Sequence, residues 1–201
     1  MDRIKKKQKT RETIIAVAKN IFNQKGFEQT TTSEIAEQAN IGHGTLFNYF
    51  DSKADLLIDV FTEEFIDRID NLDYHLTEED QTRCADEIVY LFLYRRINKY
   101  LHLRKSMFRD MMGIALTSFQ SDQERMKHFI GLDFMLVDEL IELLNHLKEE
   151  KKLAHDFDSN EAAEIIYSSL AFEFIMFLYQ HEMTKEHFLT GIRNKLKFII
   201  H

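Results

Sequence analysis

The sequence predicts an all-α protein in which three short N-terminal helices precede a larger helical domain. The 201 residues include no proline and only six glycines, so the residues that most strongly interrupt helices are scarce. Apolar residues recur at helical spacing, and several Ser, Thr or Asp residues have an acidic residue three positions later, a pattern typical of helix starts. A parallel-sheet fold would need repeated short β-branched runs, and we find none.

The first predicted helix has one apolar face. Its apolar residues recur at i, i+3, i+4, i+7 and i+8, and are Ile14, Val17, Ala18, Ile21 and Phe22. Gly26 can adopt the left-handed conformation that ends such a helix, and Phe27 is placed to pack back onto it. We therefore expect the helix to end before Gly26.

Two capping boxes then open a second and a fourth helix. In each box, a Ser or Thr hydroxyl and a later acidic side chain satisfy backbone N–H groups that a helix leaves unpaired. The pairs are Thr31 with Glu34 and Ser52 with Asp55. Between them, residues 40–42 predict a tight turn and residues 43–50 a short third helix, with Leu46 and Phe50 pointing inward.

Five further helices are expected in the C-terminal part. A polar connection at residues 71–80 precedes helices at about 81–101 and 104–117. The last three helices are expected at about 121–152, 158–181 and 184–200, and their capping residues are Ser121 with Glu124, Asp158 with Glu161, and Thr184. We place the domains at residues 1–53 and 54–201 and expect the helix that Ser52 opens to join them rigidly.

Charge is distributed unevenly along the chain. The formal net charge is −8, but residues 1–53 hold nine basic and six acidic residues, a net of +3, and the remainder holds 17 basic and 28 acidic residues, a net of −11. A basic N-terminal domain can bind nucleic acid although the protein as a whole is acidic, because the local field matters more than the total.

The single cysteine and the apolar pattern exclude several classes of protein. Cys84 stands alone, which excludes a disulfide framework and a cysteine zinc site and predicts a buried thiol. No run of 18 or more apolar residues is present, so the sequence predicts neither a membrane span nor a membrane partner. The basic N-terminus is not followed by an apolar segment and a cleavage site, so we expect a cytoplasmic protein rather than a secreted one.

Residues 31–50 have the spacing of a helix-turn-helix. In proteins of this plan, a first helix packs across two short helices, and the second of the two enters the major groove of DNA. Many small helical cores share the spacing, so a purely structural role stays open at this point. The basic residues before the first buried position can track phosphates, enter a minor groove or form a solvated tail; they are Arg3, Lys5, Lys6, Lys7 and Lys9.

The residue types at these positions carry a family resemblance. The matching segments are Arg11–Phe22 (RETIIAVAKNIF), Lys25–Phe27 (KGF), Thr31, Glu34–Ala36 (EIA), Ala39, Gly44–Phe50 (GTLFNYF) and Ser52–Lys53 (SK). Over about residues 9–60 they resemble the DNA-binding domain of the TetR family of transcriptional repressors. The resemblance implies a helix-turn-helix DNA-binding domain followed by a helical dimerisation and ligand-binding domain. It further implies a homodimer that binds a palindromic operator in double-stranded DNA and releases it when a ligand binds.

Three positions differ from the family pattern. Asn40 stands where the family usually has glycine, but asparagine tolerates a left-handed backbone, so we expect the turn to survive. Gly42 replaces the usual serine and should weaken the helix cap by only a few tenths of a kcal/mol. Phe47 replaces a usual tyrosine, which removes a phosphate hydrogen bond common in the family and leaves the operator sequence unpredicted.

The resemblance also implies roles for residues at the DNA. The start of the second helix suits a phosphate, the third helix suits base edges, with the Thr45 methyl able to contact thymine, and Tyr49 and Lys53 suit backbone phosphates. A partly buried Tyr49 and a merely exposed His43 are the alternatives. The full expected set is Thr31, Thr32, Ser33, His43, Gly44, Thr45, Phe47, Asn48, Tyr49 and Lys53.

Two apolar rows on the last two helices predict a dimer interface. They recur about every four residues and comprise Ile166, Leu170, Phe174 and Leu178 on one helix and Phe188, Ile192, Leu196 and Ile199 on the other. Such rows suit a four-helix bundle formed with a second copy, and the small residues Ser168, Ser169 and Ala171 would permit close approach of the helices. A core within one chain is the alternative.

Methionine and phenylalanine in the middle helices suggest an apolar effector. Such side chains can line an adaptable pocket, although they are more often plain core. The candidates are Met107, Phe108, Met111, Phe129, Phe134, Phe174 and Phe177. We expect no cofactor and no metal site, because the Glu/His pairs at residues 124/128 and 142/146 have the spacing of surface charge pairs.

The sequence therefore predicts a ligand-responsive repressor that is not an enzyme. A corepressor-dependent or ligand-independent DNA-binding regulator is the nearest alternative. A helical enzyme is a more distant one, since no set of nucleophile and base and no metal motif is visible in the sequence.

Overall fold

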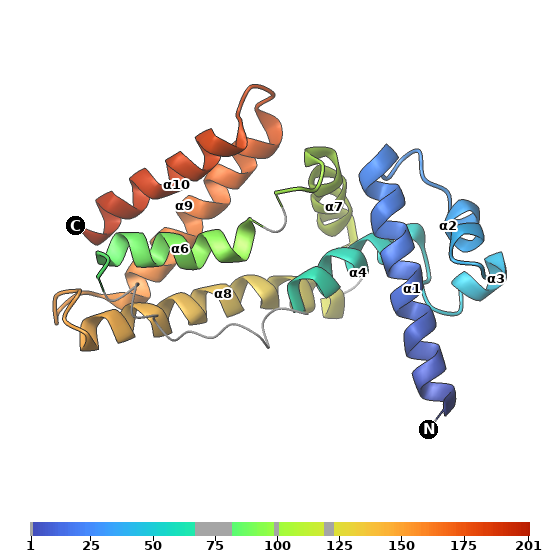
Figure 1. The fold of residues 1–201 in the computed structure, drawn as a ribbon, viewed down its shortest axis with the longest axis horizontal. Coiled ribbons are helices and arrows are strands. Elements are labelled where there is room, and N and C mark those ends of the chain that lie inside the picture. Colours follow the sequence, from blue (N-terminus) through green and yellow to red (C-terminus); the bar gives the residue numbers. More distant parts are fainter. Residues whose placement is uncertain (1, 67–81, 99–100, 119–122) are drawn as a thin grey trace. The chain divides into compact units, whose positions relative to one another are not determined.

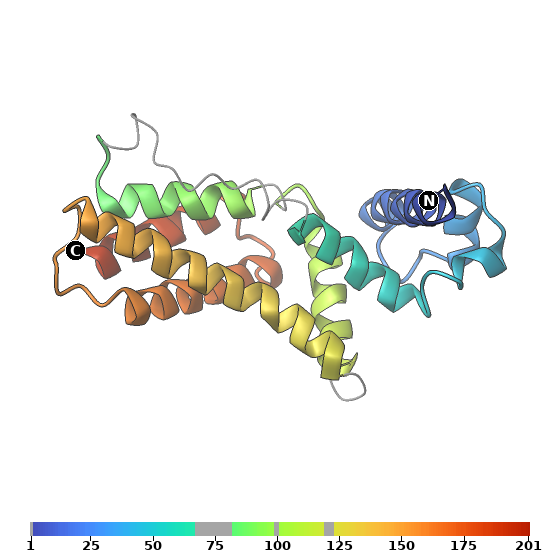
Figure 2. The same ribbon diagram turned by 90° about the horizontal axis from the view of Figure 1, so that it is seen from below.

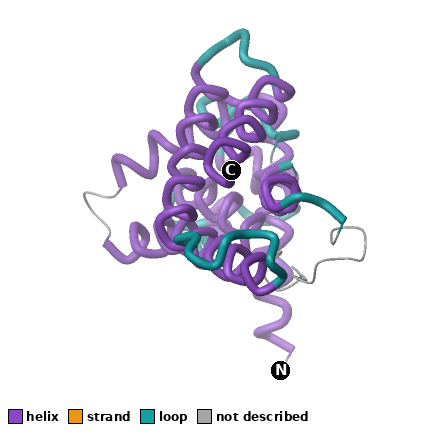
Figure 3. Tube along the Cα trace, turned by 90° about the vertical axis from the view of Figure 1, so that its left-hand side faces the viewer, coloured by secondary structure: helices purple, strands orange, loops and turns teal. Residues whose placement is uncertain are grey.

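The computed structural model consists of helices and loops, with no strand among the residues that it describes (Figure 3). These are residues 2–66, 82–98, 101–118 and 123–201, without the side chains of residues 2–3, 63–66, 115–118 and 123–134. The predicted all-α class is confirmed. The chain forms two compact units, Met1–Leu72 with Leu103–Met126, and Asp73–His102 with Lys127–His201, and each is described by itself.

The first unit contains the three N-terminal helices, the long helix that follows them, and one helix from later in the chain (Figure 1). They are α1 (Asp2–Lys25), α2 (Thr32–Gln38), α3 (His43–Leu46), α4 (Lys53–Ile66) and α7 (Lys105–Ser118). α1 packs against α2 and α4, and α4 packs against α7. The apolar face predicted for the first helix is buried, except that Val17 is half-buried.

Two left-handed residues set the turns of this unit. Gly26, just after α1, has φ +88°, as predicted for the residue that ends this helix. Asn40, between α2 and α3, has φ +54°, a region that asparagine tolerates better than most residues. The turn therefore forms although glycine is missing from it.

The hydroxyl groups of the two capping residues act as predicted, but the Glu34 carboxylate has a different partner. The Thr31 hydroxyl accepts from the Glu34 backbone N–H at 3.2 Å, and the Ser52 hydroxyl accepts from the Asp55 N–H at 3.1 Å. The Glu34 carboxylate forms an ion pair with Lys25 at the end of α1. This pair connects α2 to α1, which the capping box alone does not predict.

α3 is shorter than the predicted helix of residues 43–50. It ends at Leu46 because the next N–H groups bond to carbonyl oxygens only three residues back, Asn48 to Thr45 at 3.1 Å and Tyr49 to Leu46 at 3.0 Å. Such bonds belong to a tighter turn than the α-helix. Leu46 and Phe50 are nevertheless both buried, as predicted.

α7 belongs to the first unit rather than to a separate C-terminal one. The ring of Phe108 lies 5.1 Å from that of Phe61 on α4. Just before α7, Arg104 donates from its backbone N–H to Asn23 at 3.1 Å and from its side chain to the carbonyl oxygen of Gln24 at 2.7 Å. The first compact unit is therefore larger than the predicted domain of residues 1–53 and is not contiguous in sequence.

The second unit contains α6 (Ala85–Ile97), most of α8 (Gln123–Glu149), α9 (Ser159–Tyr179) and α10 (Lys185–Ile200) (Figure 2). α10 packs against both α9 and α6. The Arg193 guanidinium lies 4.2 Å from the centre of the Tyr90 ring, and Arg96 forms a nearly buried ion pair with Glu139 on α8. These contacts join α6 to α10 and to α8.

The starts of the last two helices match the prediction. Asp158 accepts from the N–H groups of Asn160 and Glu161, each at 3.1 Å, and Thr184 accepts from the N–H of His187 at 3.2 Å. α6 is shorter than predicted at both ends. The predicted cap Ser121 and the predicted polar connection at residues 71–80 lie outside the described residues.

Candidate nucleic-acid interface

Most of the side chains expected at the DNA lie at the surface of α2, α3 and the turn after α3. Thr31, Ser33, His43, Gly44, Phe47 and Asn48 are exposed, whereas Thr32, Thr45, Tyr49 and Lys53 are half-buried. Leu46, on the opposite side of α3, is fully buried, and Phe50 is nearly so. α3 is thus held by an apolar anchor and presents its polar side outward.

The surface of α3 is open at its second residue. A Cβ added to Gly44 would meet no atom within 4 Å. The backbone is therefore bare at this point. A duplex can approach such a position more closely than it can approach a side chain.

A contact between α2 and α3 orients the first residue of α3. Thr32 Oγ1 lies 3.0 Å from His43 Nε2, and the His43 ring meets the Phe47 ring edge-on, with centroids 5.1 Å apart. By sequence alone, Phe47 is interpreted only as a replacement for a tyrosine, whose hydroxyl would have bonded to a phosphate. The i, i+4 spacing of His43 and Phe47 was the signal for their contact. No comparable signal relates Thr32 to His43, which lie eleven residues apart.

Lys53 has a structural role that the sequence did not predict. Its ammonium donates to the carbonyl oxygens of Phe27 at 2.8 Å and Thr30 at 2.9 Å, and lies 4.2 Å from the centre of the Phe27 ring. An ammonium has three donors. A phosphate contact at Lys53 would use the third, so the residue both ties the start of α4 to the loop before α2 and remains a candidate for DNA.

A second connection joins α1 to α4. The Arg11 guanidinium pairs with the Asp59 carboxylate at 2.9 Å and lies 5.5 Å from the centre of the Phe50 ring. Asp59 is on α4, and Phe50 lies just after the turn that follows α3. α3 is therefore held by its contact with α2, while Arg11 of α1 connects the residues after α3 to α4.

Comparison with known proteins now identifies the family. Residues 14–60 match the family model described as "Bacterial regulatory proteins, tetR family". An HTH-type transcriptional regulator of Staphylococcus aureus (strain USA300) is 31% identical over 138 residues, which cover 61% of this chain and 74% of that protein. The chain belongs to the TetR family. The resemblance seen in the sequence is thereby confirmed.

Two other relatives share shorter stretches with this TetR-family chain. The fatty acid metabolism regulator protein of Bacillus subtilis (strain 168) is 36% identical over 70 residues, covering 33% of this chain and 36% of the relative. The regulator TtgR of Pseudomonas putida is 30% identical over 122 residues, covering 53% of this chain and 56% of the relative. The chain thus spans about a third of the first protein and about half of the second. Matches of this length support membership of the same family but not the same activity.

Solved structures show that the TetR-family fold extends over nearly the whole chain. FadR of Thermus thermophilus in complex with lauroyl-CoA aligns over 94% of this chain and 92% of its own, with a TM-score of 0.62 and 21% identity. A TetR-family regulator from Mesorhizobium loti aligns over 96% and 95%, with a TM-score of 0.69 and 14% identity. These identities establish the fold alone: a helix-turn-helix domain followed by a helical domain.

The apolar rows predicted to contact a second copy face the interior of the chain instead. Six of the eight residues are buried and two are half-buried; the buried ones are Ile166, Leu170, Leu178, Phe188, Ile192 and Leu196, and the half-buried ones are Phe174 and Ile199. The prediction is corrected, because the rows meet where α9 packs against α10 of the same chain.

A different apolar row of the TetR-family protein is exposed on α9. Its members follow one another at helical spacing, and are Ile165 (43% exposed), Phe172 (56%), Ile175 (42%) and Tyr179 (60%). Phe198 on α10 is 89% exposed. We call these five residues the outer apolar face. By length and composition alone α9 could also cross a membrane, which the sequence did not predict, but its other side packs against α10.

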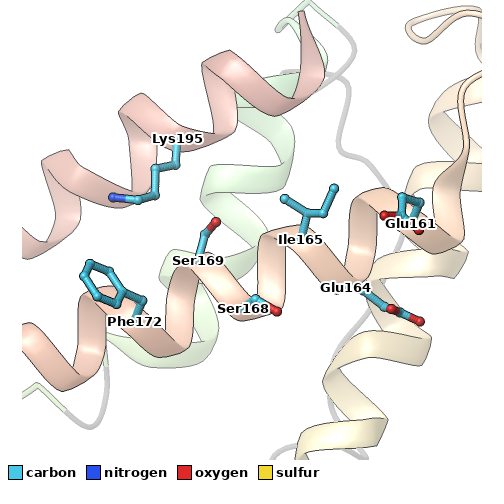
Figure 4. Close-up of a pocket in the computed structure, with 7 residues that line it drawn as sticks. All are labelled: Glu161, Glu164, Ile165, Ser168, Ser169, Phe172 and Lys195. Atoms are coloured by element: carbon cyan, nitrogen blue, oxygen red, sulfur yellow. The ribbon is translucent and has the colours of Figure 1, made fainter.

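An open hollow of about 420 Å³ lies on the same side of α9. Ser168 and Ser169 lie between Ile165 and Phe172, with Lys195 of α10 across from them (Figure 4). The Lys195 ammonium forms an ion pair with Glu173, which is only 8% exposed.

Gly191 makes room for the Glu173 side chain. A Cβ at residue 191 would lie 2.8 Å from the carboxylate carbon of Glu173. Only glycine at this position of α10 leaves the carboxylate where it lies.

The candidate effector residues are divided between the two units. Met107, Phe108 and Met111 are buried in the first unit, where Phe108 meets Phe61. In the second unit, the rings of Phe174 and Phe177 lie 6.0 and 5.2 Å from that of Phe188. The side chains of Phe129 and Phe134 lie outside the described residues. A shared effector pocket stays a prediction.

Cys84 is exposed, so the prediction of a buried thiol was wrong. It lies at the N-cap of α6, and its side chain makes no capping hydrogen bond. The hydrogen bond to the Asp86 carboxylate and partial burial raise the pKa of the Cys84 thiol.

Among the described residues, no group of three His, Cys, Asp or Glu side chains is placed to hold a metal ion.

Proposed function

We propose that this protein is a ligand-responsive transcriptional repressor that binds a palindromic operator as a homodimer. The observation that carries the proposal is the position of α3, a short helix with buried Leu46 on its inner side, with His43 and Gly44 exposed on its outer side and Asn48 exposed in the turn after it. A helix presented in this way suits the major groove. Thr45 and Asn48 have the side chains for base edges, and Thr31, Thr32 and Ser33 have those for a phosphate.

The outer apolar face supports dimerisation. An isolated surface Leu or Phe needs no explanation, but a continuous apolar row along a 21-residue helix suits contact with another helix. Two copies related by a two-fold axis would bring together two α9 and two α10 helices as a four-helix bundle. Ser168 and Ser169, in the middle of the row, are small enough to let the helices approach closely.

An apolar effector is proposed for the helical domain. Similar structures include FadR of Thermus thermophilus in complex with lauroyl-CoA and FadR of Bacillus subtilis in complex with stearoyl-CoA. Because the middle helices of this chain are rich in Met and Phe, a ligand with a long acyl chain is a suitable first candidate. To shift a two-state repressor almost completely, ligand must favour the released state by about 5.5 kcal/mol.

The test is selection of binding sites from random duplex DNA with the purified protein. A palindromic consensus whose affinity falls steeply with salt is the expected result. Thr45→Ala should change the preferred base at one position of each half-site while leaving the others. Acyl-CoA added to the selected complex should then release the DNA.

Other outcomes of this selection separate the competing functions. Enrichment only after cell extract is added would indicate a corepressor, and enrichment that no acyl-CoA or other apolar compound reverses would indicate a ligand-independent regulator. Folded protein that enriches no sequence in either setting would contradict the proposal. Turnover of a bound compound would instead favour an enzyme. The proposal requires that the protein lies in the cytoplasm, where bacterial DNA is found.

A further inference from the structure

The helix-turn-helix segment of this chain is acidic. Residues 26–52, which include α2 and α3, hold four acidic residues and no lysine or arginine. Residues 1–25 hold eight basic and two acidic residues. Duplex DNA carries about one negative charge per 1.7 Å of its axis, and proteins gain much of their affinity by placing Lys and Arg at phosphates. The segment expected to contact bases therefore does not supply this attraction.

Three of the basic side chains around that segment have partners within the protein. Lys25 pairs with Glu34, and Arg11 pairs with Asp59. The Lys53 ammonium donates to two carbonyl oxygens. The carboxylates partly offset the charges of Lys25 and Arg11, and the carbonyl oxygens hold the Lys53 ammonium in place. Other residues must therefore provide most of the attraction to a polyanion.

Four lysines near the start of α1 are placed differently. Lys5, Lys6, Lys7 and Lys9 are exposed, and no ion pair joins their side chains to another residue that the structure describes. The first buried residue of α1 is Ile14, so this part of the helix lies outside the core. Figure 1 shows it continuing beyond α2 and α3. Residues 4–9, all exposed, extend for about 9 Å at 1.5 Å per residue.

Local forces within α1 disfavour these lysines. Lys5 and Lys9 are four residues apart, and like charges at this spacing destabilise a helix. Positive side chains near a helix N-terminus also oppose the helix dipole. A bound polyanion would relieve both effects. The four lysines are thus an unfavourable choice for the free helix and a favourable one for a helix on DNA.

We propose that these four lysines, the basic segment of α1, form a second DNA contact that binds backbone phosphates beside the bases reached by α3. This inference rests on the proposed function. The basic segment supplies attraction that does not depend on sequence, whereas α3 supplies the choice of sequence. The two contributions are separable by mutation, because none of the four lysines holds the three-helix core together.

The experiment compares the full-length protein with two quadruple variants, in which Lys5, Lys6, Lys7 and Lys9 are all changed to Ala or all changed to Arg. Affinity for the selected operator and for random duplex is measured by fluorescence anisotropy across a range of salt concentrations. Each lost phosphate contact should reduce the magnitude of the slope of log K against log[salt] by about one. The slope of the Ala variant should therefore be smaller in magnitude by about two to four per chain. The Arg variant should retain the wild-type slope.

The outcomes distinguish this inference from the proposed function. An Ala variant that weakens binding to the operator and to random DNA by the same factor, with thermal stability no lower than that of wild type, supports it. An Ala variant with the wild-type slope on an operator that wild type binds would overturn it and leave the proposed function standing. Wild-type protein that binds no duplex would overturn both. Retention of wild type but not the Ala variant on phosphatidylglycerol vesicles, with an unchanged DNA slope, would assign the segment to a membrane surface instead.

Discussion

The Thr32 hydroxyl and the His43 ring nitrogen Nε2 lie 3.0 Å apart, and this contact joins the start of α2 to the start of α3. Thr32 lies where a phosphate is expected and His43 where a base edge is expected. The contact therefore joins Thr32, which is expected to bind DNA of any sequence, to His43, which is expected to contribute to sequence specificity. It also holds the His43 ring between Thr32 and the Phe47 ring.

Thr32→Val and His43→Ala should act on operator affinity in a non-additive way. Valine keeps the shape of threonine but removes the hydroxyl that orients the ring. In a double-mutant cycle by fluorescence anisotropy, we expect a coupling of about 0.5–1.5 kcal/mol. Thr45→Ala paired with Thr32→Val provides the control, and additive effects in both pairs would show that the contact has no role at the DNA.

Lys53→Met should lower the stability of the protein as well as its affinity for DNA. Removing the ammonium takes a donor from the Thr30 carbonyl oxygen and one from the Phe27 carbonyl oxygen, which still accepts from the Thr30 N–H, and this should cost about 1–3 kcal/mol of unfolding free energy. Urea unfolding followed by circular dichroism measures this loss, and Lys197→Met at an exposed position of α10 is the control. Weaker DNA binding with unchanged stability would mean that Lys53 acts at the phosphate alone.

Phe172→Glu should produce a folded monomer, whereas Leu170→Glu should unfold the protein. Phe172 is 56% exposed on the outer apolar face, so a carboxylate there remains hydrated in the monomer but would be buried in the dimer. Leu170 is buried, and a charge there should cost about 4 kcal/mol or more. Sedimentation velocity and circular dichroism test both. A dimeric Phe172→Glu variant would place the interface elsewhere.

Gly191→Ala should destabilise the packing of α10 against α9. The new Cβ would displace the end of the Glu173 side chain from its place beside Lys195, and because that side chain is flexible and alanine is favoured over glycine in a helix, the net cost should be about 1 kcal/mol or less in thermal or urea unfolding. Gly113→Ala is the matched control, because a Cβ there meets no atom within 4 Å and alanine favours the helix. The loss should shrink in a Glu173→Ala background; an equal loss in both backgrounds would rule out Glu173 as its cause.

Asp86 should contribute stability at neutral pH that is lost in acid. Burial by itself raises the pKa of the Asp86 carboxyl, but hydrogen bonds with Cys84 and His201, together with the charge of His201, outweigh it and lower the pKa below its usual value. A lowered folded-state pKa gives stability that is present above the unfolded value of about 3.9 and is lost as pH falls through the folded value.

The unfolding free energies of wild type and Asp86→Asn should therefore differ most near pH 7 and converge toward pH 3. Because the same carboxylate raises the pKa of the Cys84 thiol, Asp86→Asn should also make Cys84 react faster with a disulfide reagent at pH 8. A stability difference that stays constant with pH would show that Asp86 acts through packing rather than through its charge.

Local signals predicted much of the helical fold and the exposed side of α3. The caps at Thr31, Ser52, Asp158 and Thr184 form because each depends on a side chain and an N–H group only two or three residues away. The exposed face of α3 follows from the periodicity that buries Leu46. Contacts between distant residues were not predictable in this way: the Lys53 ammonium meets carbonyl oxygens 23 and 26 residues away.

The sequence by itself determined that the helix at residues 159–179 is apolar on more than one side, and that the N-terminal segment has the TetR-family pattern. Only the tertiary structure decided which side of that helix faces the interior. Ile166 and Leu170 are buried in the unit where α9 packs against α10, whereas Ile165 and Phe172 remain exposed. Helical periodicity specifies which residues share a face, but a helix with two apolar faces can bury either. The choice depends on packing against α10 of the same chain, an interaction that no local pattern contains.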